Sequence, residues 1–320
     1  MMRIAHIMIA LAVTVWLASA APGAPGPSYP IKPVAMIVGW PAGQAIDLVA
    51  RALVEAARPF FPVYVVNRPG GAGTIGAAEV VLAKPDGYTI GMTAVAVMTV
   101  QPHLTDLPYR TPEDYRTVIK IGGHAVVFCV RADARWRTLA DVLEQARASP
   151  GAVRVGSAGV GTIPHIDLEA LKEKAGVNLT HVPFAGAGEY ISALLGGHIE
   201  AVVGLPVEVI PHVRAGRVRP LAIFSAKRSP LFPGVPTFPE LGYDISAGVY
   251  HFVIVPKATP DRVVQILHDA LKRAVETEAF RKFAEDNSYV IDYMGPSDLK
   301  RQLERDYTFF GDMVRKLKLR

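Results

Sequence analysis

Two stretches of the sequence combine residue types that could hold an anion. The first is Trp40-Pro41-Ala42-Gly43-Gln44-Ala45-Ile46-Asp47, and an apolar run at residues 33–38 leads into it and predicts a buried strand. Pro41 and Gly43 end that strand, and Asp47 is a candidate N-cap for the helical pattern that follows. A helix N-terminus offers free backbone N–H groups and a positive dipole end, which suit a carboxylate or a phosphate.

The second stretch is Gly156-Ser157-Ala158-Gly159-Val160-Gly161-Thr162-Ile163-Pro164-His165. A strand is expected to end at Ser157, and a helix to start at Thr162 with Pro164 in its first turn. Two hydroxyls, backbone N–H groups around Gly161 and the His165 imidazole would then gather at one helix start. Each pattern is also typical of an ordinary strand-to-helix turn. Two of them in one chain favour a shared site, because ligands of α/β sheets bind at the carboxyl ends of strands.

Catalytic and metal sites fit the sequence less well. Ser157, His165 and Asp167 suggest a triad, but His165 would belong to the same turn as the serine, and the serine lacks the G-x-S-x-G elbow. The histidines at 165, 181, 198 and 212 do not have a metal-binding spacing, so no metal site is predicted. No acidic pair is placed for acid–base catalysis.

One motif keeps an enzymatic alternative open. Gly71, Gly73 and Gly76 fit the G-x-G-x-x-G spacing between a predicted strand and a predicted helix, which is typical of dinucleotide binding. The next strand ends at residues 92–95 without the acidic residue that would hold a ribose. The alternative to cofactor-free function is therefore a nucleotide-dependent enzyme using the loop at residues 71–76. The simpler interpretation is a tight loop whose glycines permit positive φ and close helix packing.

The remaining elements predict an α/β fold with a mainly parallel sheet. Predicted strands alternate with helical runs over most of the chain. The strands are expected at residues 63–66, 88–93, 126–130, 153–157, 179–183, 199–203, 218–224, 249–255 and 289–293. Thr138 and Asp141 form a capping box, and residues 260–320 are mostly amphipathic helix.

The N-terminus predicts export. Arg3, an apolar core at residues 7–17 and Ala18-Ser19-Ala20 form a signal peptide over residues 1–20, cleaved after Ala20, and residues 21–28 form a flexible lead. The chain has 320 residues, a formal charge of +5 and a single cysteine, Cys129, in an apolar run. The mild, scattered charge does not favour nucleic-acid binding, and the cysteine is expected to be buried and inert.

Eight motifs in sequence resemble the Bug (TctC-like) family of extracytoplasmic solute receptors. They cover the whole mature chain in order. They are Tyr29-Pro30-x-Lys32-Pro33, residues 40–51, residues 66–76, Pro85-Asp86-Gly87-Tyr88-Thr89, Gly161-Thr162-Ile163-Pro164-His165, His181-Val182-Pro183-Phe184, residues 194–200 and residues 235–243.

The resemblance implies a two-lobed periplasmic-binding-protein fold of the flytrap type, with two crossing segments. Lobe 1 would comprise residues 28–128 plus 248–320, and lobe 2 residues 129–247. It further implies a periplasmic, non-catalytic monomer without a cofactor, which binds a small carboxylate for tripartite tricarboxylate-type uptake or for sensing. Its partners would be the membrane components of such a transporter or a sensor kinase. The predicted ligand-binding residues are Trp40, Ala42, Gly43, Gln44, Ala45, Asp47, Ser157, Gly161, Thr162, His165 and Phe184.

Two departures from the family pattern bear on the ligand. The family loop usually has a second glycine and a hydroxyl residue ahead of the Asp, where this chain has Gln44 and Ile46. Gln44 adds a hydrogen-bond donor and an acceptor. The family often has Lys after the Val-Pro-aromatic stretch, where this chain has Ala185. The loss of that cation favours a ligand tail that is less anionic or more apolar.

Overall fold

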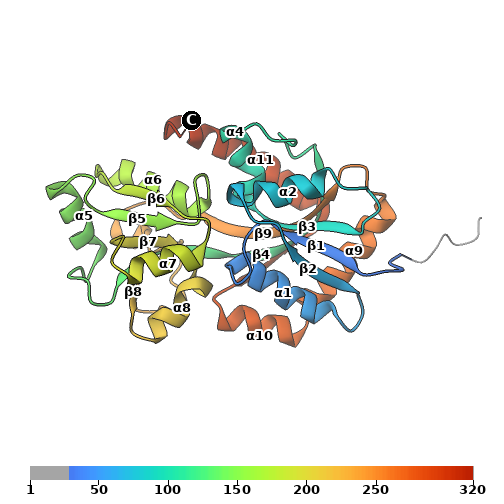
Figure 1. Ribbon diagram of the computed structural model, residues 1–320, viewed down its shortest axis with the longest axis horizontal. Helices are drawn as coiled ribbons and strands as arrows, with labels where there is room; N and C mark the ends of the chain where they lie inside the picture. Colours follow the sequence, from blue (N-terminus) through green and yellow to red (C-terminus); the bar gives the residue numbers. More distant parts are fainter. Residues whose placement is uncertain (1–28, 320) are drawn as a thin grey trace, which may run out of the picture.

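The computed structural model describes residues 29–319 and shows two α/β lobes that lie side by side (Figure 1). The predicted signal peptide and flexible lead lie outside the described residues. Each lobe contains a sheet covered by helices, and one long strand, β4 (Tyr115–Arg131), belongs to both sheets. Within residues 29–319 no helix is both long and apolar enough to cross a bilayer.

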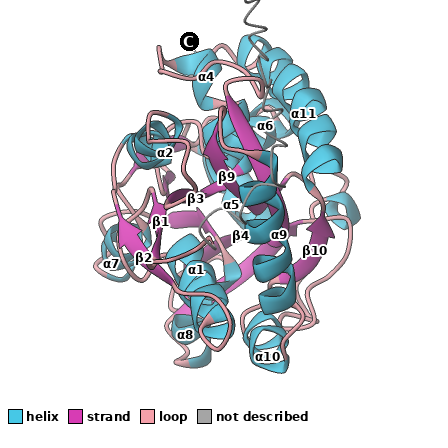
Figure 2. Cartoon of the chain, turned by 90° about the vertical axis from the view of Figure 1, so that its right-hand side faces the viewer, coloured by secondary structure: helices cyan, strands magenta, loops and turns pink. Residues whose placement is uncertain are grey.

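The first sheet combines parallel and antiparallel strands. Its order is β2 (Val63–Asn67), β1 (Val34–Val38), β3 (Thr89–Ala94), β9 (Gly248–Pro256) and β4, with β10 (Val290–Met294) also paired to β4. Strand β1 runs parallel to β2 and β3, whereas β9 runs antiparallel to β3 and β4. The helices of this lobe are α1 (Ala45–Ala57), α2 (Thr74–Val81), α3 (Val95–Thr99), α4 (Gln101–Leu104), α9 (Asp261–Val275), α10 (Glu278–Asp286) and α11 (Pro296–Lys316). Figure 2 shows α1, α9 and α10 against this sheet.

The second sheet is smaller. Its strands are β6 (Thr180–Pro183), β5 (Arg154–Ser157), β7 (Ala201–Gly204), β4 and β8 (Val218–Phe224). Its helices are α5 (Leu139–Ala148), α6 (Ile163–Ala175), α7 (Ala187–Leu195) and α8 (Pro206–Arg214). Short 3-10 turns lie at Gly71–Gly73 and Pro239–Leu241.

Strand β4 changes sheets in its middle. Its pairing with β9 ends at Ala125 opposite Gly248, and its pairing with β8 begins at Val126 opposite Phe224. Strand β4 is therefore one crossing segment between the lobes, and the chain entering β9 is the other. The residue boundaries given above for the lobes remain a prediction.

Two expectations about the elements are corrected. The sheet is not mainly parallel, because β4 runs antiparallel to all four of its partners, β7, β8, β9 and β10. Asp47 is not the N-cap of α1, because the helix begins two residues earlier, at Ala45, with Gln44 in extended conformation before it. By contrast, the Thr138–Asp141 capping box, the Thr162 N-cap and the buried Cys129 are confirmed.

Candidate functional site

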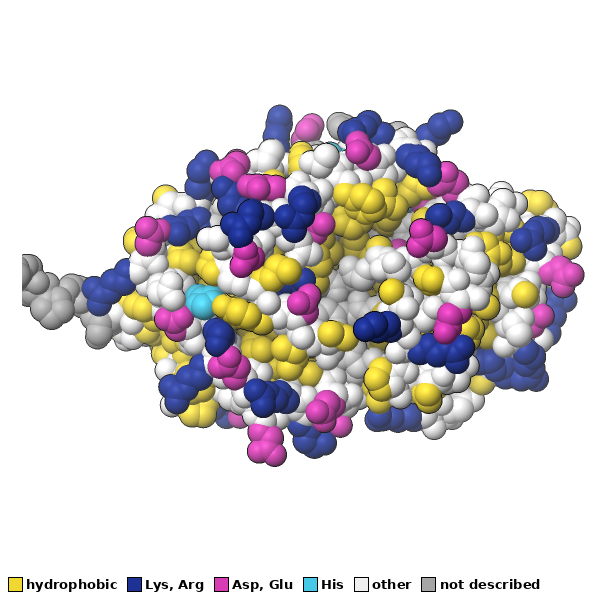
Figure 3. All heavy atoms as spheres, turned by 180° about the vertical axis from the view of Figure 1, so that it is seen from behind, with side chains coloured by type: hydrophobic (Ala, Val, Ile, Leu, Met, Phe, Trp, Pro, Cys, Tyr) yellow, Lys and Arg dark blue, Asp and Glu magenta, His cyan; other side chains and the backbone are white. Residues whose placement is uncertain are grey.

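A cavity of about 50 Å³ lies between the two lobes. Its wall takes residues from the starts of three helices of nine or more residues: α1, α6 and α8. Seen from behind, charged side chains of both signs are scattered over the molecule and apolar side chains gather in the recess between its halves (Figure 3). The wall residues are Trp40, Gln44, Ala45, Ile46, Ala94, Ala96, Ala158, Thr162, Ile163, Pro164, Tyr190, Val203, Gly204, Leu205, Glu208, Val249 and His251.

The first predicted loop is held by a buried carboxylate. Asp47 is fully buried, and its Oδ2 accepts from the Gly43 N–H at 2.8 Å and from Arg51 Nε at 2.9 Å. Its Oδ1 accepts from Asn67 Nδ2 at 2.8 Å, and the same amide nitrogen donates to the Trp40 carbonyl at 2.9 Å. Burial alone raises the pKa of Asp47, but the hydrogen bonds from Arg51, Gly43 and Asn67 hold it below its ordinary value. Asp47 therefore positions the loop from behind the cavity wall.

The glycines at 73 and 76 pack against that loop. Gly73 has φ of 95°, and a Cβ there would overlap the Trp40 ring. A Cβ at Gly76 would overlap the Cα of Gly39. These glycines therefore bring the loop before α2 into contact with the loop before α1. The surface that a pyrophosphate would need at Gly73 and Gly76 is covered by Trp40 and Gly39.

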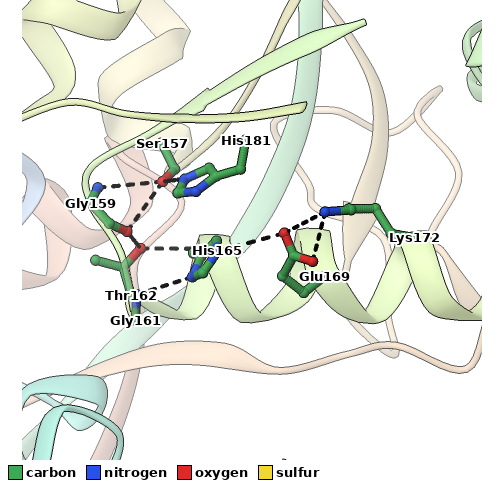
Figure 4. A network of polar contacts seen from close by, with 8 residues as sticks. All are labelled: Ser157, Gly159, Gly161, Thr162, His165, Glu169, Lys172 and His181. Atoms are coloured by element: carbon green, nitrogen blue, oxygen red, sulfur yellow. Dashed lines mark hydrogen bonds and ion pairs between the residues drawn. The ribbon is translucent and has the colours of Figure 1, made fainter. Parts of the chain in front are cut away.

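The second predicted loop is held by a hydrogen-bond network at the start of α6 (Figure 4). Thr162 Oγ1 donates to the Gly159 carbonyl at 2.9 Å and accepts from the His165 N–H at 3.4 Å. Ser157 Oγ lies 2.7 Å from His181 Nε2, and it accepts from the Gly159 N–H at 3.3 Å. Both hydroxyls thus have partners inside the loop, and only Thr162 of the pair lies on the cavity wall.

The His165 side chain contacts three neighbouring residues. Its Nδ1 accepts from the Gly161 N–H at 3.0 Å, its Nε2 lies 3.6 Å from Glu169, and its ring stacks on His181 at 4.0 Å. Burial and the neighbouring His165 lower the pKa of His181 to about 3, so that His181 is neutral at physiological pH. The pair fixes the turn that carries Thr162 rather than facing the cavity.

The two lobes touch around the cavity. Gln44 Nε2 donates to the Ala185 carbonyl at 3.4 Å, and Gln101 Nε2 donates to the Val160 carbonyl at 2.7 Å. A Cβ at Gly186 would overlap the Gln44 amide. Gln44 and Ala185, which both depart from the family pattern, are therefore in direct contact across the lobes.

A third helix start contributes polar groups that the sequence interpretation missed. Glu208, in the first turn of α8, accepts from the Leu205 N–H at 2.8 Å and from the Tyr190 hydroxyl. Its other oxygen, Oε1, lies 3.5 Å from the Ala45 N–H of the opposite lobe. His251 on β9 is also on the wall, and burial, with His124 beside it, holds its pKa well below the ordinary value. The signal for Glu208 is that Leu205 and Pro206 follow a predicted strand in the same strand-to-helix arrangement as the other two loops.

The predicted ligand-binding residues divide into two groups. Trp40, Gln44, Ala45 and Thr162 lie on the cavity wall. The others lie behind the wall or beside the loops, and as ligand contacts they remain predictions: Ala42, Gly43, Asp47, Ser157, Gly161, His165 and Phe184.

Thr162→Ala should weaken ligand binding about tenfold, because the Thr162 hydroxyl both caps α6 and fixes the Gly159 carbonyl beside the cavity. Loss of the cap should also lower the free energy of unfolding by about 1 kcal/mol. Thr138→Ala is the matched control, since Thr138 caps α5 in the same way but does not line the cavity. Calorimetry and melting of both variants separate the effects. Equal affinities for the two variants would exclude a role for Thr162 at the site.

Asp167→Asn should stabilise the protein progressively as pH rises. Asp167 on α6 is 1% exposed, and within residues 29–319 neither of its side-chain oxygens has a hydrogen-bond partner. Burial raises the pKa of Asp167 well above its ordinary value. The folded state therefore keeps a proton that the unfolded state loses, so wild-type stability falls as pH rises above the unfolded pKa.

The measurement for Asp167→Asn is chemical unfolding at pH 5 and pH 8. The stability gained by the variant should increase between these values by at least about 1.4 kcal/mol, the equivalent of one pKa unit. Asp106→Asn, an exposed acid in the same chain, should show no such change. A gain that is the same at both pH values would contradict the assignment of a proton to Asp167.

The fold and the site together define a class: two α/β lobes are linked by two crossing segments and have a cavity between them, as in periplasmic binding proteins. Residues 49–319 match the family model described as "Tripartite tricarboxylate transporter family receptor". The chain belongs to this family, whose members are periplasmic solute-binding receptors.

Three relatives illustrate the match. The UPF0065 protein in the gbd 5′ region of Cupriavidus necator is 34% identical over 256 residues, covering 79% of this chain and 78% of that protein. The periplasmic binding protein BugD superposes with a TM-score of 0.86 at 27% identity, covering 91% of this chain and 99% of BugD. MatC of Rhodopseudomonas palustris, solved with bound malate, superposes with a TM-score of 0.83 at 25% identity, covering 89% of this chain and 100% of MatC.

Proposed function

We propose that this chain is an exported, non-catalytic receptor that captures a small carboxylate between its lobes in the periplasm. The observation that carries the proposal is the convergence of α1, α6 and α8, which all begin at the cavity wall. The first N–H groups of each helix have no intrahelical acceptor, and the helix dipoles add positive potential. An anion is therefore favoured there although the wall residues within 29–319 include no Lys or Arg.

The residues proposed to touch the ligand are Trp40, Gln44, Ala45 and Thr162. The backbone N–H groups of Ile46 and of Ala45, which otherwise faces Glu208 Oε1 at 3.5 Å, would bind one side of the carboxylate at the start of α1. The start of α6, beyond Thr162, would receive the other. Asp47, Ser157 and His165 would act through the loops that they position.

The proposed role is supply of the captured ligand to the membrane components of a tripartite tricarboxylate transporter, or to a sensor kinase. A monomer suffices, because both helix starts of the clamp come from one chain. The malate bound by the relative MatC agrees with a small carboxylate. It does not identify the ligand of this chain.

Mass spectrometry of ligand co-purified with the mature protein, without residues 1–20, tests the proposal. A small carboxylic acid is expected, and the same acid added back should raise the melting temperature. Small-angle scattering should show a more compact molecule with the acid than without it, because closure retains the ligand. A melting shift with NAD and none with any carboxylic acid would instead support the nucleotide-dependent alternative.

A further inference from the structure

An acidic side chain lies on the wall of the cavity proposed to bind an acid. Glu208 is partly buried. Its carboxylate accepts hydrogen bonds from three groups: the Tyr190 hydroxyl, the Leu205 N–H and the Ala45 N–H. Donated hydrogen bonds favour the ionised form of a carboxylate, and the Leu205 and Ala45 N–H groups can only donate. Burial is the largest effect and raises the pKa of Glu208 above its ordinary value, while these three hydrogen bonds act in the opposite direction. A cation beside the carboxylate would favour its ionised form.

The two carboxylate oxygens of Glu208 have different hydrogen-bond partners. Oε2 accepts from the Leu205 N–H at 2.8 Å and from Tyr190, so it is held by its own lobe. Among the described residues, Oε1 has only the long 3.5 Å contact with the Ala45 N–H of the other lobe. A carboxylate oxygen can accept further hydrogen bonds, so Oε1 has capacity for a donor on a ligand.

Neighbouring residues fix the position of the Glu208 carboxylate. Tyr190 is fully buried, and its hydroxyl reaches Glu208 over Gly204, where a Cβ would overlap that hydroxyl. Glu208 also closes the capping arrangement at the start of α8. The carboxylate is therefore fixed in place beside the ligand space.

A second negative charge would be repelled by Glu208, because no Lys or Arg stands on the wall among the described residues. His251 is the one wall residue among those described whose side chain has an ionisable nitrogen, and it is neutral at physiological pH because its pKa lies well below the ordinary value. A ligand that carries its own cation beside its carboxylate resolves this conflict. Its carboxylate would take the helix starts and its cation would take Oε1.

We infer that Glu208 is a specificity-determining residue and that the ligand is a zwitterion, a small amino acid whose ammonium group donates to Glu208 Oε1. This inference rests on the proposed function, since it assumes that the ligand's carboxylate is held at the starts of α1 and α6. Tyr190 is a positioning residue that orients the Glu208 carboxylate.

The experiment uses calorimetry on the mature protein with matched probes. These are the twenty standard amino acids, des-amino counterparts such as propionate and succinate, and amides such as alaninamide. The proteins are wild type, Glu208→Gln and the control Glu144→Gln, which makes the same change at an exposed position on α5 of the same lobe. Melting of each protein without ligand checks that the fold is retained.

In wild type and Glu144→Gln, the best amino acid should bind at least about tenfold tighter than its des-amino counterpart, the value of one charged hydrogen bond. In Glu208→Gln that preference should fall to about threefold or less. Tyr190→Phe keeps the charge but removes one donor to Oε2, and it should reduce the preference to an intermediate value. This second variant keeps the test open if Glu208→Gln does not fold.

Three results would overturn parts of the account separately. Des-amino acids that bind as tightly as amino acids, and tighter still in Glu208→Gln, would overturn the role of Glu208 and leave the carboxylate receptor standing. Alaninamide that binds as tightly as alanine would overturn the carboxylate clamp and leave the ammonium contact standing. Failure of every amino acid to bind would overturn the inference itself.

Discussion

Ala158→Phe should abolish ligand binding while the protein stays folded. Ala158 is partly buried in the loop between β5 and α6, and its methyl group forms part of the cavity wall. The cavity holds only about 50 Å³, so an added phenyl ring would occupy the space of the ligand. Because the ring projects into an interlobe space, the lobes can open to accommodate it without disturbing either sheet.

The expected loss of affinity is at least about a hundredfold, the equivalent of two lost hydrogen bonds to a charged group. Calorimetry measures this loss, and scattering should show that the variant no longer becomes compact when the carboxylate is added. Ala148→Phe is the matched control, because Ala148 is exposed at the end of α5 in the same lobe. Retention of wild-type affinity by Ala158→Phe would place the ligand elsewhere.

Asp47→Ala should cause the largest loss of stability among the loop residues. Its carboxylate receives the Gly43 N–H, Arg51 and Asn67 in a fully buried position. Removal would leave these donors without their acceptor beside Trp40. We expect a loss of about 3 kcal/mol in the free energy of unfolding, below the upper range for buried pairs because Arg51 is half exposed.

The pH dependence gives a second signature of Asp47. Its folded-state pKa is lowered, so its contribution to stability is complete above the unfolded pKa and is lost as pH falls through the folded pKa. The difference between wild type and Asp47→Ala should therefore shrink below about pH 4. Glu55→Ala, which removes an exposed ion pair with Arg58 on the same helix, should cost less than about 1 kcal/mol. Equal losses for both variants would contradict a structural role for Asp47.

The strand-to-helix turns were readable from the sequence because their signals are local. Thr162 with Pro164 marks a helix start in any context, and the structure places Thr162 as the N-cap beside the cavity. The N-cap of α1 lies three residues before the predicted one, because Asp47 lies inside the first turn and its carboxylate accepts from the preceding Gly43 N–H. An Asp at the N-cap and an Asp inside the first turn look the same in the sequence, so the sequence alone does not fix the helix boundary.

The contacts between segments that are distant in the sequence could not be predicted from the sequence. Tyr190 and Glu208 meet only because α7 and α8 are brought together over Gly204, and Gln44 meets Ala185 only across the lobes. Antiparallel pairing of β4 with β7, β8 and β9 was also missed. A strand that crosses between lobes has the same apolar pattern as one that stays within a parallel sheet, so periodicity cannot tell the two apart.

The most direct test of the central claim is calorimetry of the mature protein with acids and their own amides. The pairs are propionate and propionamide, succinate and its monoamide succinamate, and alanine and alaninamide, so that in each pair one carboxylate is replaced by an amide. If the starts of α1 and α6 hold a carboxylate, the best acid should bind at least about tenfold tighter than its amide. Amides that bind as tightly as their acids would contradict the anion clamp between the lobes.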